Sequence, residues 1–216
     1  MRIYVVRHGE TESNADRIRQ SREGYLSDDG IQEARAAASK LSSLKIDSIF
    51  TSSYPRAKQT ADIISALGKG LLVQVSEYLT EVKLPSEVVG RPVDDPKSKK
   101  IFSWLTSHIT SPTARFSDEE TYNEYVSRAR QVLEHIEKTG FENTVVVTHH
   151  RFIHILVAVV LVGNELTPQL FNLIRNHIYI SNTGITVIEK NEEKEGAWHL
   201  LTLNEHSHLE EAKKSN

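Results

Sequence analysis

The sequence predicts an α/β protein of three layers, α/β/α, with a mostly parallel central sheet and an inserted lid-like segment. Two patterns predict it. Short runs rich in β-branched residues alternate along the chain with longer segments whose apolar residues recur at helical spacing. In addition, runs such as RIYVV at 2–6 and NTVVVTH at 143–149 carry apolar residues on both sides of the strand, as parallel strands covered by helices do.

Composition narrows the function. The 216 residues are 38% hydrophobic and 25% charged, which suits one folded domain over 1–216, and the formal charge of −3 offers no basic field for nucleic acid or an anionic membrane. No cysteine is present, so disulfides, thiolate metal sites and cysteine nucleophiles are excluded. The longest apolar run, 152–163, is shorter than the roughly 20 residues that span a bilayer. The apolar run at the start of the sequence is too short for a signal peptide. We therefore expect no membrane partner and a cytoplasmic location.

The first half of the chain alternates strands and helices. After the strand at 2–6 and a polar loop, LSDDG at 26–30 offers Ser27 or Asp28 as the cap of a helix. A second strand at 47–52 precedes a helix that begins at Pro55 and ends at Gly68. A third strand follows at 71–75.

Residues 84 to about 115 interrupt this pattern. The segment holds four of the six prolines around one predicted helix at 98–109, so we interpret it as an excursion that lies over the active site as a lid. It also carries many cations in or beside it. They form either a solvated face or contacts to a second anionic group of a substrate: Lys83, Arg91, Lys97, Lys99, Lys100 and Arg115.

The alternation then resumes. The stretch Ser117–Glu120 has the pattern of a capping box, and a helix follows as far as Gly140. The strand at 143–149 runs directly into the apolar helix. Further strands are predicted at 177–181, 184–190 and 198–203, and an exposed strand near the C-terminus could pair with a second copy as a homodimer.

Polar residues stand directly after four of the predicted strands. They are Arg7 with His8, the stretch 52–56, the stretch 77–81, and His149 with His150. The carboxyl ends of parallel strands meet at one edge of the sheet, where ligands bind in such folds. We therefore expect these residues to share one pocket.

Such a pocket suits a phosphoryl group. Arginine forks grip phosphate oxygens in pairs, and a neutral imidazole can attack phosphorus. A carboxylic acid can protonate the leaving alcohol, while a second imidazolium stabilises the charge that spreads over the equatorial oxygens. This inventory fits phosphoryl transfer through a phosphohistidine, without a metal or another cofactor.

Four motifs in order make the chain resemble the histidine phosphatase superfamily, in the branch that contains the cofactor-dependent phosphoglycerate mutases. Its signature stands here as RHGET at 7–11 with Asn14 three residues on. The second motif is SSYPRAKQTA at 52–61, the third is LTE at 79–81, and the late Val-x-His is VTH at 147–149. The resemblance covers nearly the whole chain.

The resemblance implies the role of each residue. His8 is the phosphorylated nucleophile, and Glu81 is the proton donor to the leaving group, with Glu77 and Glu87 as neighbouring alternatives. Glu10 occupies the family's acidic position, where it would orient Arg7 or share in proton handling. His150 replaces the usual glycine and either narrows the phosphate site or adds a donor. The phosphate ligands are implied to be Arg7, Asn14, Arg56, His149 and His150.

The favoured interpretation is a phosphatase that acts on a small phosphorylated substrate, and three alternatives to it are considered. The first is phosphoglycerate mutase-like transfer, which is disfavoured because KLPSEVVGRP replaces the mutase residues after the acid. The second is a catalytically silent relative that binds phosphorylated ligands. The third is a metal site on His150 and His154, which stand one helical turn apart but lack a carboxylate on the same helix.

Overall fold

The computed structural model describes residues 1–68, 70–191 and 197–214, and within them it contains one six-stranded sheet. The strands run in the order β3-β2-β4-β1-β5-β6. The first four of that order are parallel to one another. Strand β5 runs antiparallel to β1, and β6 runs antiparallel to β5. The bounds are β1 Arg2–Arg7, β2 Ser48–Ser52, β3 Val73–Ser76, β4 Asn143–Thr148, β5 Ile185–Lys190 and β6 Trp198–Glu205. A mostly parallel sheet is therefore confirmed.

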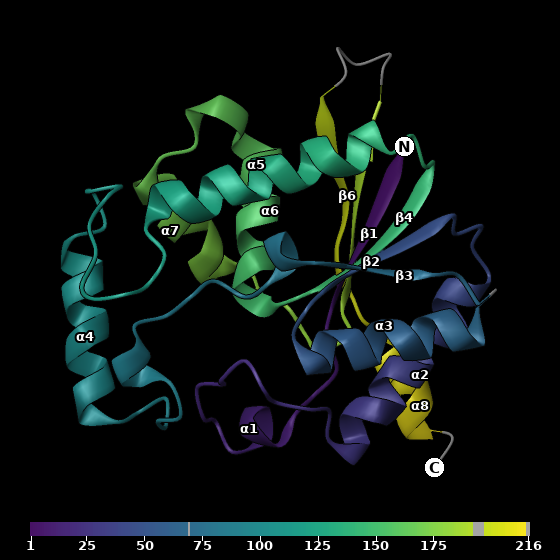
Figure 1. The fold of residues 1–216 in the computed structure, drawn as a ribbon, viewed down its shortest axis with the longest axis horizontal. Helices are drawn as coiled ribbons and strands as arrows, with labels where there is room; N and C mark the ends of the chain where they lie inside the picture. The colour runs from purple at the N-terminus through teal and green to yellow at the C-terminus, as the bar shows by residue number, and fades with distance from the viewer. Residues whose placement is uncertain (69, 192–196, 215–216) are drawn as a thin grey trace.

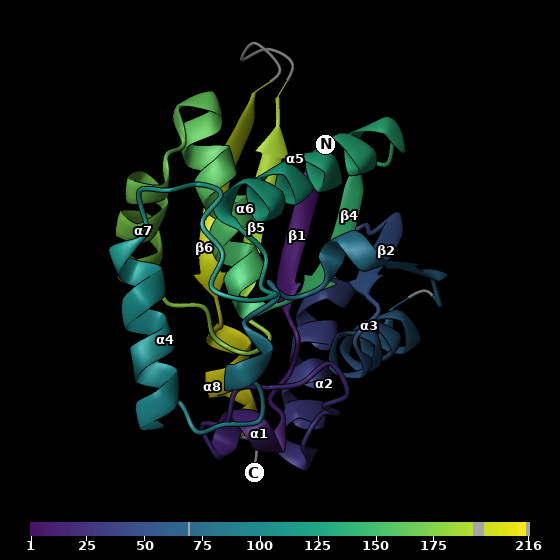
Figure 2. The same cartoon turned by 60° about the vertical axis from the view of Figure 1, so that its left-hand side comes forward.

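Helices cover both faces of this sheet (Figures 1 and 2). On one face lie α2 (Asp28–Ser42) and α3 (Pro55–Leu67), with α8 (Ser207–Lys214) beside α2. On the other face lie α5 (Tyr122–Lys138) and α6 (His150–Val162), with α7 (Pro168–His177) against α6. Ser27 caps α2 by accepting from the N–H of Gly30, as predicted. The three-layer α/β/α fold is thus confirmed.

Strand β1 shows how the sequence builds two cores. Ile3 and Val5 pack with α5 and α6, whereas Tyr4 and Val6 pack with α2 and α3. Successive side chains of a strand point to opposite faces, so each face of this strand is buried in its own core. The strand is therefore clamped on both sides, which fixes the position of the residues that follow it.

The segment predicted as an excursion lies between β3 and α5. It holds a short turn at Ser86–Val88 and one helix, α4 (Pro96–Ser107), which stands away from the sheet on the side of α7 (Figure 1). The ring of Phe102 on α4 lies 4.6 Å from the guanidinium carbon of Arg19 and 5.5 Å from that of Arg151. Cation–π contacts of this kind attach α4 to the body of the protein.

Two local predictions were wrong. The capping box is not Ser117–Glu120 but Thr121 with Glu124, whose side chains each accept from the other's backbone N–H. The carboxylate of Glu119 instead accepts from the N–H groups of Phe116 and Ser117, so it stabilises the preceding loop.

The strand predicted at 177–181 is absent. Helix α7, which the sequence analysis did not predict, ends at His177, and the following residues bond to side chains instead of a neighbouring strand. The carbonyl oxygen of Ile180 accepts from Arg7, and the N–H of Ser181 donates to Asn204. Alternating apolar residues therefore do not form a strand here, because side chains have taken the backbone groups that a ladder needs.

Helices α1 (Glu12–Ala15) and α8 were not predicted either, and short 3₁₀ turns stand at Glu77–Leu79 and Gly163–Glu165. Strand β6 forms one outer edge of the sheet, so an edge exists where pairing with a second copy was predicted. In the described parts of the chain, no helix combines the length and apolar character needed to cross a membrane.

Candidate active site

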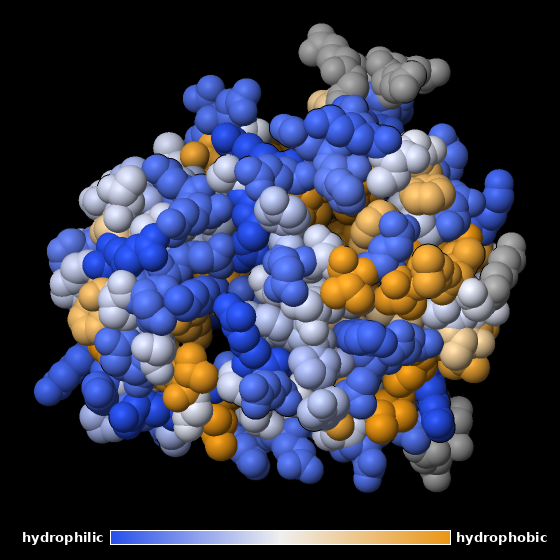
Figure 3. Space-filling model, viewed as in Figure 1, coloured by the Kyte–Doolittle hydropathy of each residue, from blue (hydrophilic) through white to orange (hydrophobic). Residues whose placement is uncertain are grey.

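The four predicted strand ends converge beside one cavity of about 780 Å³. Strands β1 and β4 run in parallel register, with Arg7 opposite Thr148, and the N–H of His8 donates to the Thr148 carbonyl at 3.0 Å. Figure 3 shows the viewed face hollowed between the side of α4 and the side of α2 and α3. Several of the expected residues line the cavity, namely Arg7, His8, Asn14, Arg56, Glu81 and His150.

His8 is held in one tautomer. Its side chain is buried, with Nδ1 2.7 Å from the carbonyl oxygen of Gly9 and Nε2 3.3 Å from Nε of Arg56. Arginine only donates, so Nε2 must carry the lone pair and Nδ1 the proton. Burial, reinforced by the charges of Arg56 and Arg7, lowers the pKa of His8 well below its ordinary value. The ring is therefore neutral at physiological pH and offers Nε2 as a nucleophile.

Two arginines, Arg7 and Arg56, line the cavity together with His8. Arg56, on the first turn of α3, is 2% exposed and also donates from Nη1 to the carbonyl of Ser21 at 3.0 Å. Burial lowers the pKa of Arg56 to about 10, so the guanidinium still carries its charge at neutral pH. Arg7 donates to Ile180, but its buried Nε has no hydrogen-bond partner among the described residues. An orphan donor of this kind suits an anion in the cavity.

His149 lies behind His8 and is not among the residues that line the cavity. The two ring centroids are 5.1 Å apart, and Nε2 of His149 lies 2.8 Å from Oγ of Ser52. Its Nδ1 is buried without a hydrogen-bond partner in the described part of the chain. Burial, followed by the charges of its neighbours, lowers the pKa of His149 well below the ordinary value. His149 is therefore a neutral ring packed beside His8, behind the wall of the cavity.

His150 and Asn14 complete the polar lining. His150 opens α6, and burial together with the charge of Arg7 lowers its pKa to about 3, so it is neutral at physiological pH. Asn14 lies on α1, where its Oδ1 accepts from Thr11 at 3.2 Å and from Asn182 at 3.4 Å. With Oδ1 engaged in this way, the amide group of Asn14 is oriented beside the cavity.

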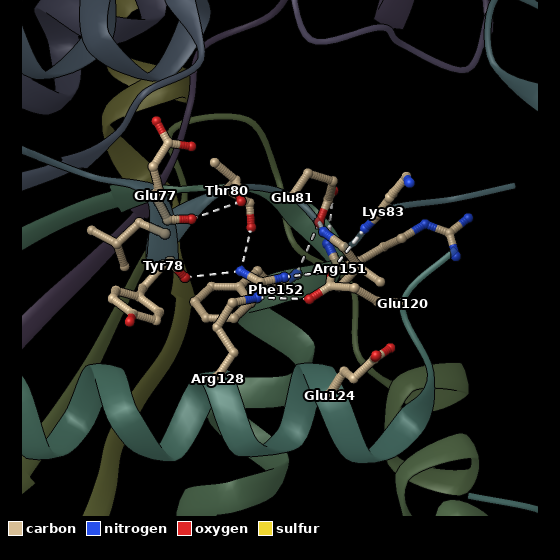
Figure 4. A network of polar contacts seen from close by, with 12 residues as sticks. Glu77, Tyr78, Thr80, Glu81, Lys83, Glu120, Glu124, Arg128, Arg151 and Phe152 are labelled. Atoms are coloured by element: carbon tan, nitrogen blue, oxygen red, sulfur yellow. Dashed lines mark hydrogen bonds and ion pairs between the residues drawn. The ribbon is translucent and has the colours of Figure 1, made fainter. Parts of the chain in front are cut away.

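The carboxylate of Glu81 sits over the first turn of α6 (Figure 4). Its Oε2 accepts from the backbone N–H of Arg151 at 3.2 Å, and its Oε1 accepts from those of Phe152 and Val82 at 3.1 and 2.9 Å. Helix N-termini bind anions in this way, so the helix aims this carboxylate at the cavity.

The other carboxylates that the sequence offered lie elsewhere. Glu77 is exposed and points away from Glu81 (Figure 4), and Glu87 accepts from the hydroxyl of Ser117 at 2.8 Å. Glu10 accepts from the Ser27 hydroxyl at 3.2 Å, while Arg7 bonds to Ile180. Of Glu77, Glu81 and Glu87, Glu81 alone lines the cavity.

The motif residues without charge hold these groups in place. A Cβ on Gly9 would collide with the carbonyl oxygen of Gly30, so the two glycines let the loop after β1 touch the first turn of α2. The N–H of Gly9 donates to the hydroxyl of Thr60 at 3.1 Å, and Gln59 accepts from the N–H of Leu26 at 2.9 Å. Helix α3 thus carries Arg56 and also clamps the loop of His8.

The two histidines on α6 that the sequence offered as metal ligands are His150 and His154, and His154 makes other contacts. The ring nitrogens of His154 lie 2.7 and 3.0 Å from the carbonyl oxygens of His150 and Ile178. Within residues 1–68, 70–191 and 197–214, no group of three or more histidine or acidic side chains is arranged to hold a metal ion.

Several site residues were missed. Ser52 was noted only as part of a motif, although its hydroxyl orients His149, and the amide of Asn182 donates to the carbonyl of His8 at 3.0 Å. Arg151 lines the cavity but was not considered. Its charge in the first turn of a helix was the available signal, because a cation there opposes the positive end of the helix dipole unless an anion is present.

Comparisons with known proteins agree on one family. The family model of the histidine phosphatase superfamily (branch 1) matches residues 3–206. A Hydrogenobacter thermophilus protein with the provisional name phosphoserine phosphatase 2 is 29% identical over 198 residues, which cover 89% of this chain and 91% of that protein. Phosphoglycerate mutase-like protein 4 of Arabidopsis thaliana is 34% identical over 155 residues, 68% of this chain and 65% of that protein. The phosphoserine phosphatase of Entamoeba histolytica, solved as a mutant with phosphoserine, superposes with a TM-score of 0.77 at 22% identity and covers 96% and 98% of the two chains.

Proposed function

Because the chain belongs to the histidine phosphatase superfamily, branch 1, we propose that it is a phosphomonoester phosphatase that works through a phosphohistidine on His8. One observation carries the proposal. The neutral ring of His8 is fixed by Gly9 so that its Nε2 lone pair lies beside Arg56 at the wall of the cavity. A buried nucleophile beside guanidinium groups is the arrangement that phosphoryl transfer needs.

The reaction has two balanced steps. With the negatively charged ester beside it, Glu81 takes up a proton. Nε2 of His8 then attacks phosphorus while the ester P–O bond breaks, and Glu81 gives that proton to the departing alkoxide. Water then attacks the phosphohistidine, Glu81 takes the proton from that water, and phosphate leaves. We assign Arg7 and Arg56 to the stabilisation of charge on the phosphoryl oxygens, with Asn14 and His150 as further donors. His149, which the resemblance implied as a phosphate ligand, does not line the cavity, so we assign it to the orientation of His8.

The segment 84–115 acts in this proposal as a lid over the pocket of a small phosphorylated substrate. Leu84, Ser86, Val89 and Val93 line the same cavity as His8, which supports that role. A closed lid excludes water while the first step occurs. A cytoplasmic location stays a prediction from composition.

The direct test is release of phosphate from an aryl phosphate in the presence of EDTA. The wild-type protein should turn over, vanadate should inhibit it, and His8→Ala should lower kcat by about 10³-fold or more. His135→Ala, at an exposed position on α5, is the matched control and should keep wild-type activity. Turnover that survives in His8→Ala would refute the phosphohistidine, and loss of activity in EDTA that zinc restores would favour a metal.

Two further assays separate the roles and the alternatives. Glu81→Gln should slow alkyl phosphates far more than aryl phosphates, because poor leaving groups depend on the proton donor. Equal slowing of both would assign the acid to another residue. Conversion of 3- to 2-phosphoglycerate with added bisphosphate would instead reveal mutase activity, and we expect none above the rate of phosphate release.

A further inference from the structure

A second cavity, of about 310 Å³, adjoins the first. The two share Val82, His150 and Arg151 as lining residues, so the second one opens beside the proposed site of phosphoryl transfer. Its wall comes mainly from α4, α5, α6 and α7, and half of its lining residues are apolar; the others are two arginines, two histidines and one asparagine. Besides Val82, the apolar side chains are Phe102, Tyr125, Ile155 and Phe171.

Arg151 is the first of the two arginines. It stands on α6 between the two cavities, and its half-buried guanidinium rests against the ring of Phe102. In the part of the chain that the structure describes, no carboxylate forms an ion pair with it. Burial lowers the pKa of Arg151, Glu81 opposes this change, and the charges of Arg175 and Arg19 lower the pKa further. Arg151 therefore lies near one carboxylate, that of Glu81, and near two like charges.

Arg175 is the second arginine. It lies on α7 and is half-buried, donates from Nε to Asn172 at 3.0 Å, and has its guanidinium carbon 5.9 Å from the centre of the Phe171 ring. The described residues offer it no carboxylate at ion-pair distance. Two guanidinium groups from different helices thus face one cavity whose described lining residues include no carboxylate.

Arg128 shows what a structural arginine looks like in the same region. On the neighbouring α5, it binds both carboxylate oxygens of Glu120 at 2.8 and 2.7 Å and donates to the carbonyls of Tyr78 and Thr80 (Figure 4). All three of its nitrogens are used. Arg151 and Arg175 have no such set of partners, so their charges remain available to a ligand.

We propose that Arg151 and Arg175 form a second anion subsite, which selects phosphomonoesters that carry a carboxylate or a second phosphate beyond an apolar spacer. This proposal rests on the proposed phosphatase function. In it, the scissile phosphate lies by His8, the spacer lies along Phe102 and Phe171, and the second anion accepts from the two guanidinium groups.

The test uses two substrate series of increasing length. One consists of phosphorylated ω-hydroxycarboxylic acids, each compared with its methyl ester; the other consists of α,ω-diol bisphosphates, each compared with the monophosphate. At the best length, kcat/KM of the wild-type protein should favour the doubly anionic substrate by about tenfold or more, the size of one hydrogen bond between charged groups. The series with the larger preference identifies the second anion.

Variants assign that preference to the arginines. Arg175→Met keeps the apolar stem and should reduce the ratio of acid to ester to about one, Arg175→Lys should restore part of it, and Arg151→Met should also reduce it. Arg35→Met, at an exposed position on α2, is the control and should keep the wild-type ratio. Equal hydrolysis of acid and ester at every length, or a preference that survives both methionine variants, would overturn the subsite alone. Failure of the wild-type protein to hydrolyse any ester would overturn the phosphatase function and the subsite together.

Discussion

The strand-end side of the cavity and the segment 84–115 opposite it are held by different kinds of contact. Around His8, backbone touches backbone at Gly9 and Gly30, and buried hydroxyls bond to the loop. Residues 90–93 of the segment share backbone hydrogen bonds with residues 17–19. The rest of the segment 84–115 is attached by side chains, such as the partly exposed ion pair of Arg115 with Glu124 and the ring of Phe102 against Arg19. Exposed pairs contribute about 0–1 kcal/mol each. The proposed chemistry therefore sits on the rigid side, whereas helix α4 of the segment, held by side chains, is easier to displace.

Replacing one glycine by alanine on each side should show the largest difference in stability between the two sides. Gly9→Ala forces a Cβ against the Gly30 carbonyl, so we expect it to lower the free energy of unfolding by roughly 3 kcal/mol and to disturb His8. Gly90→Ala, at φ 75° with open space around it, should cost only about 1 kcal/mol. Urea denaturation measures both, and equal losses would contradict a difference in rigidity.

As the pH falls, the free energy of unfolding should decrease first through the buried histidines on the strand-end side. His8 and His149 have pKa values well below their ordinary value in the folded protein, so near pH 6 the unfolded chain binds more protons than the folded one. The free energy of unfolding should therefore fall as pH drops below about 6.5, by up to about 1.4 kcal/mol per pH unit for each histidine.

On the segment side, the pKa of Asp118 is lowered to about 2 by its bonds to Ser86 and Lys83. Its contribution to stability is present above the carboxyl's ordinary pKa and is lost only in stronger acid, as pH falls through the folded value. Urea midpoints at pH 7 and pH 5 test the histidine effect, and His149→Gln should flatten the dependence. A wild-type midpoint that does not change between these values would refute the assignment.

A smaller effect is expected at Ser52. Ser52→Ala removes the hydroxyl that meets Nε2 of His149, so the ring loses its orientation and kcat should fall about tenfold with little change in KM. Ser103→Ala, exposed on α4, is the control and should leave kcat unchanged. The pH profile separates this role from a purely structural one, because the acidic limb should move as the environment of His149 changes.

The smallest effect concerns the lysines of α4. Lys97, Lys99 and Lys100 are exposed and do not line either cavity, which agrees with the solvated face that was one of the two interpretations of these cations. Their joint replacement by glutamine should change kcat/KM less than about twofold at physiological salt. A larger, salt-dependent loss would mean that charge on the segment side guides the substrate after all.

The strand ends were predictable because a parallel sheet brings them together whatever the loops do. RHG at 7–9 and VTH at 147–149 follow apolar runs, and pairing of Arg7 with Thr148 places them side by side. The clamping role of Gly9 was not predictable, since it depends on a glycine on another element.

The second arginine pair shows where sequence reasoning ends. Arg151 and Arg175 are 24 positions apart on different helices, and only the packing of α7 on α6 brings them to one cavity. The strand predicted at 177–181 does not form, for a related reason. Its alternation is that of a strand, but Arg7 takes the carbonyl of Ile180 and His154 meets that of Ile178.

That short stretch after α7 connects the two charged regions mechanically. Its carbonyl at Ile180 holds Arg7, and the amide of Asn182 holds the backbone of His8, while α7 directly before it carries Arg175. This piece of backbone therefore helps to set the separation between the proposed phosphoryl site and Arg175 of the proposed second subsite. A substrate that reached both would have to match this separation in length. Adding or removing one residue in the stretch would therefore change the preferred length of substrate.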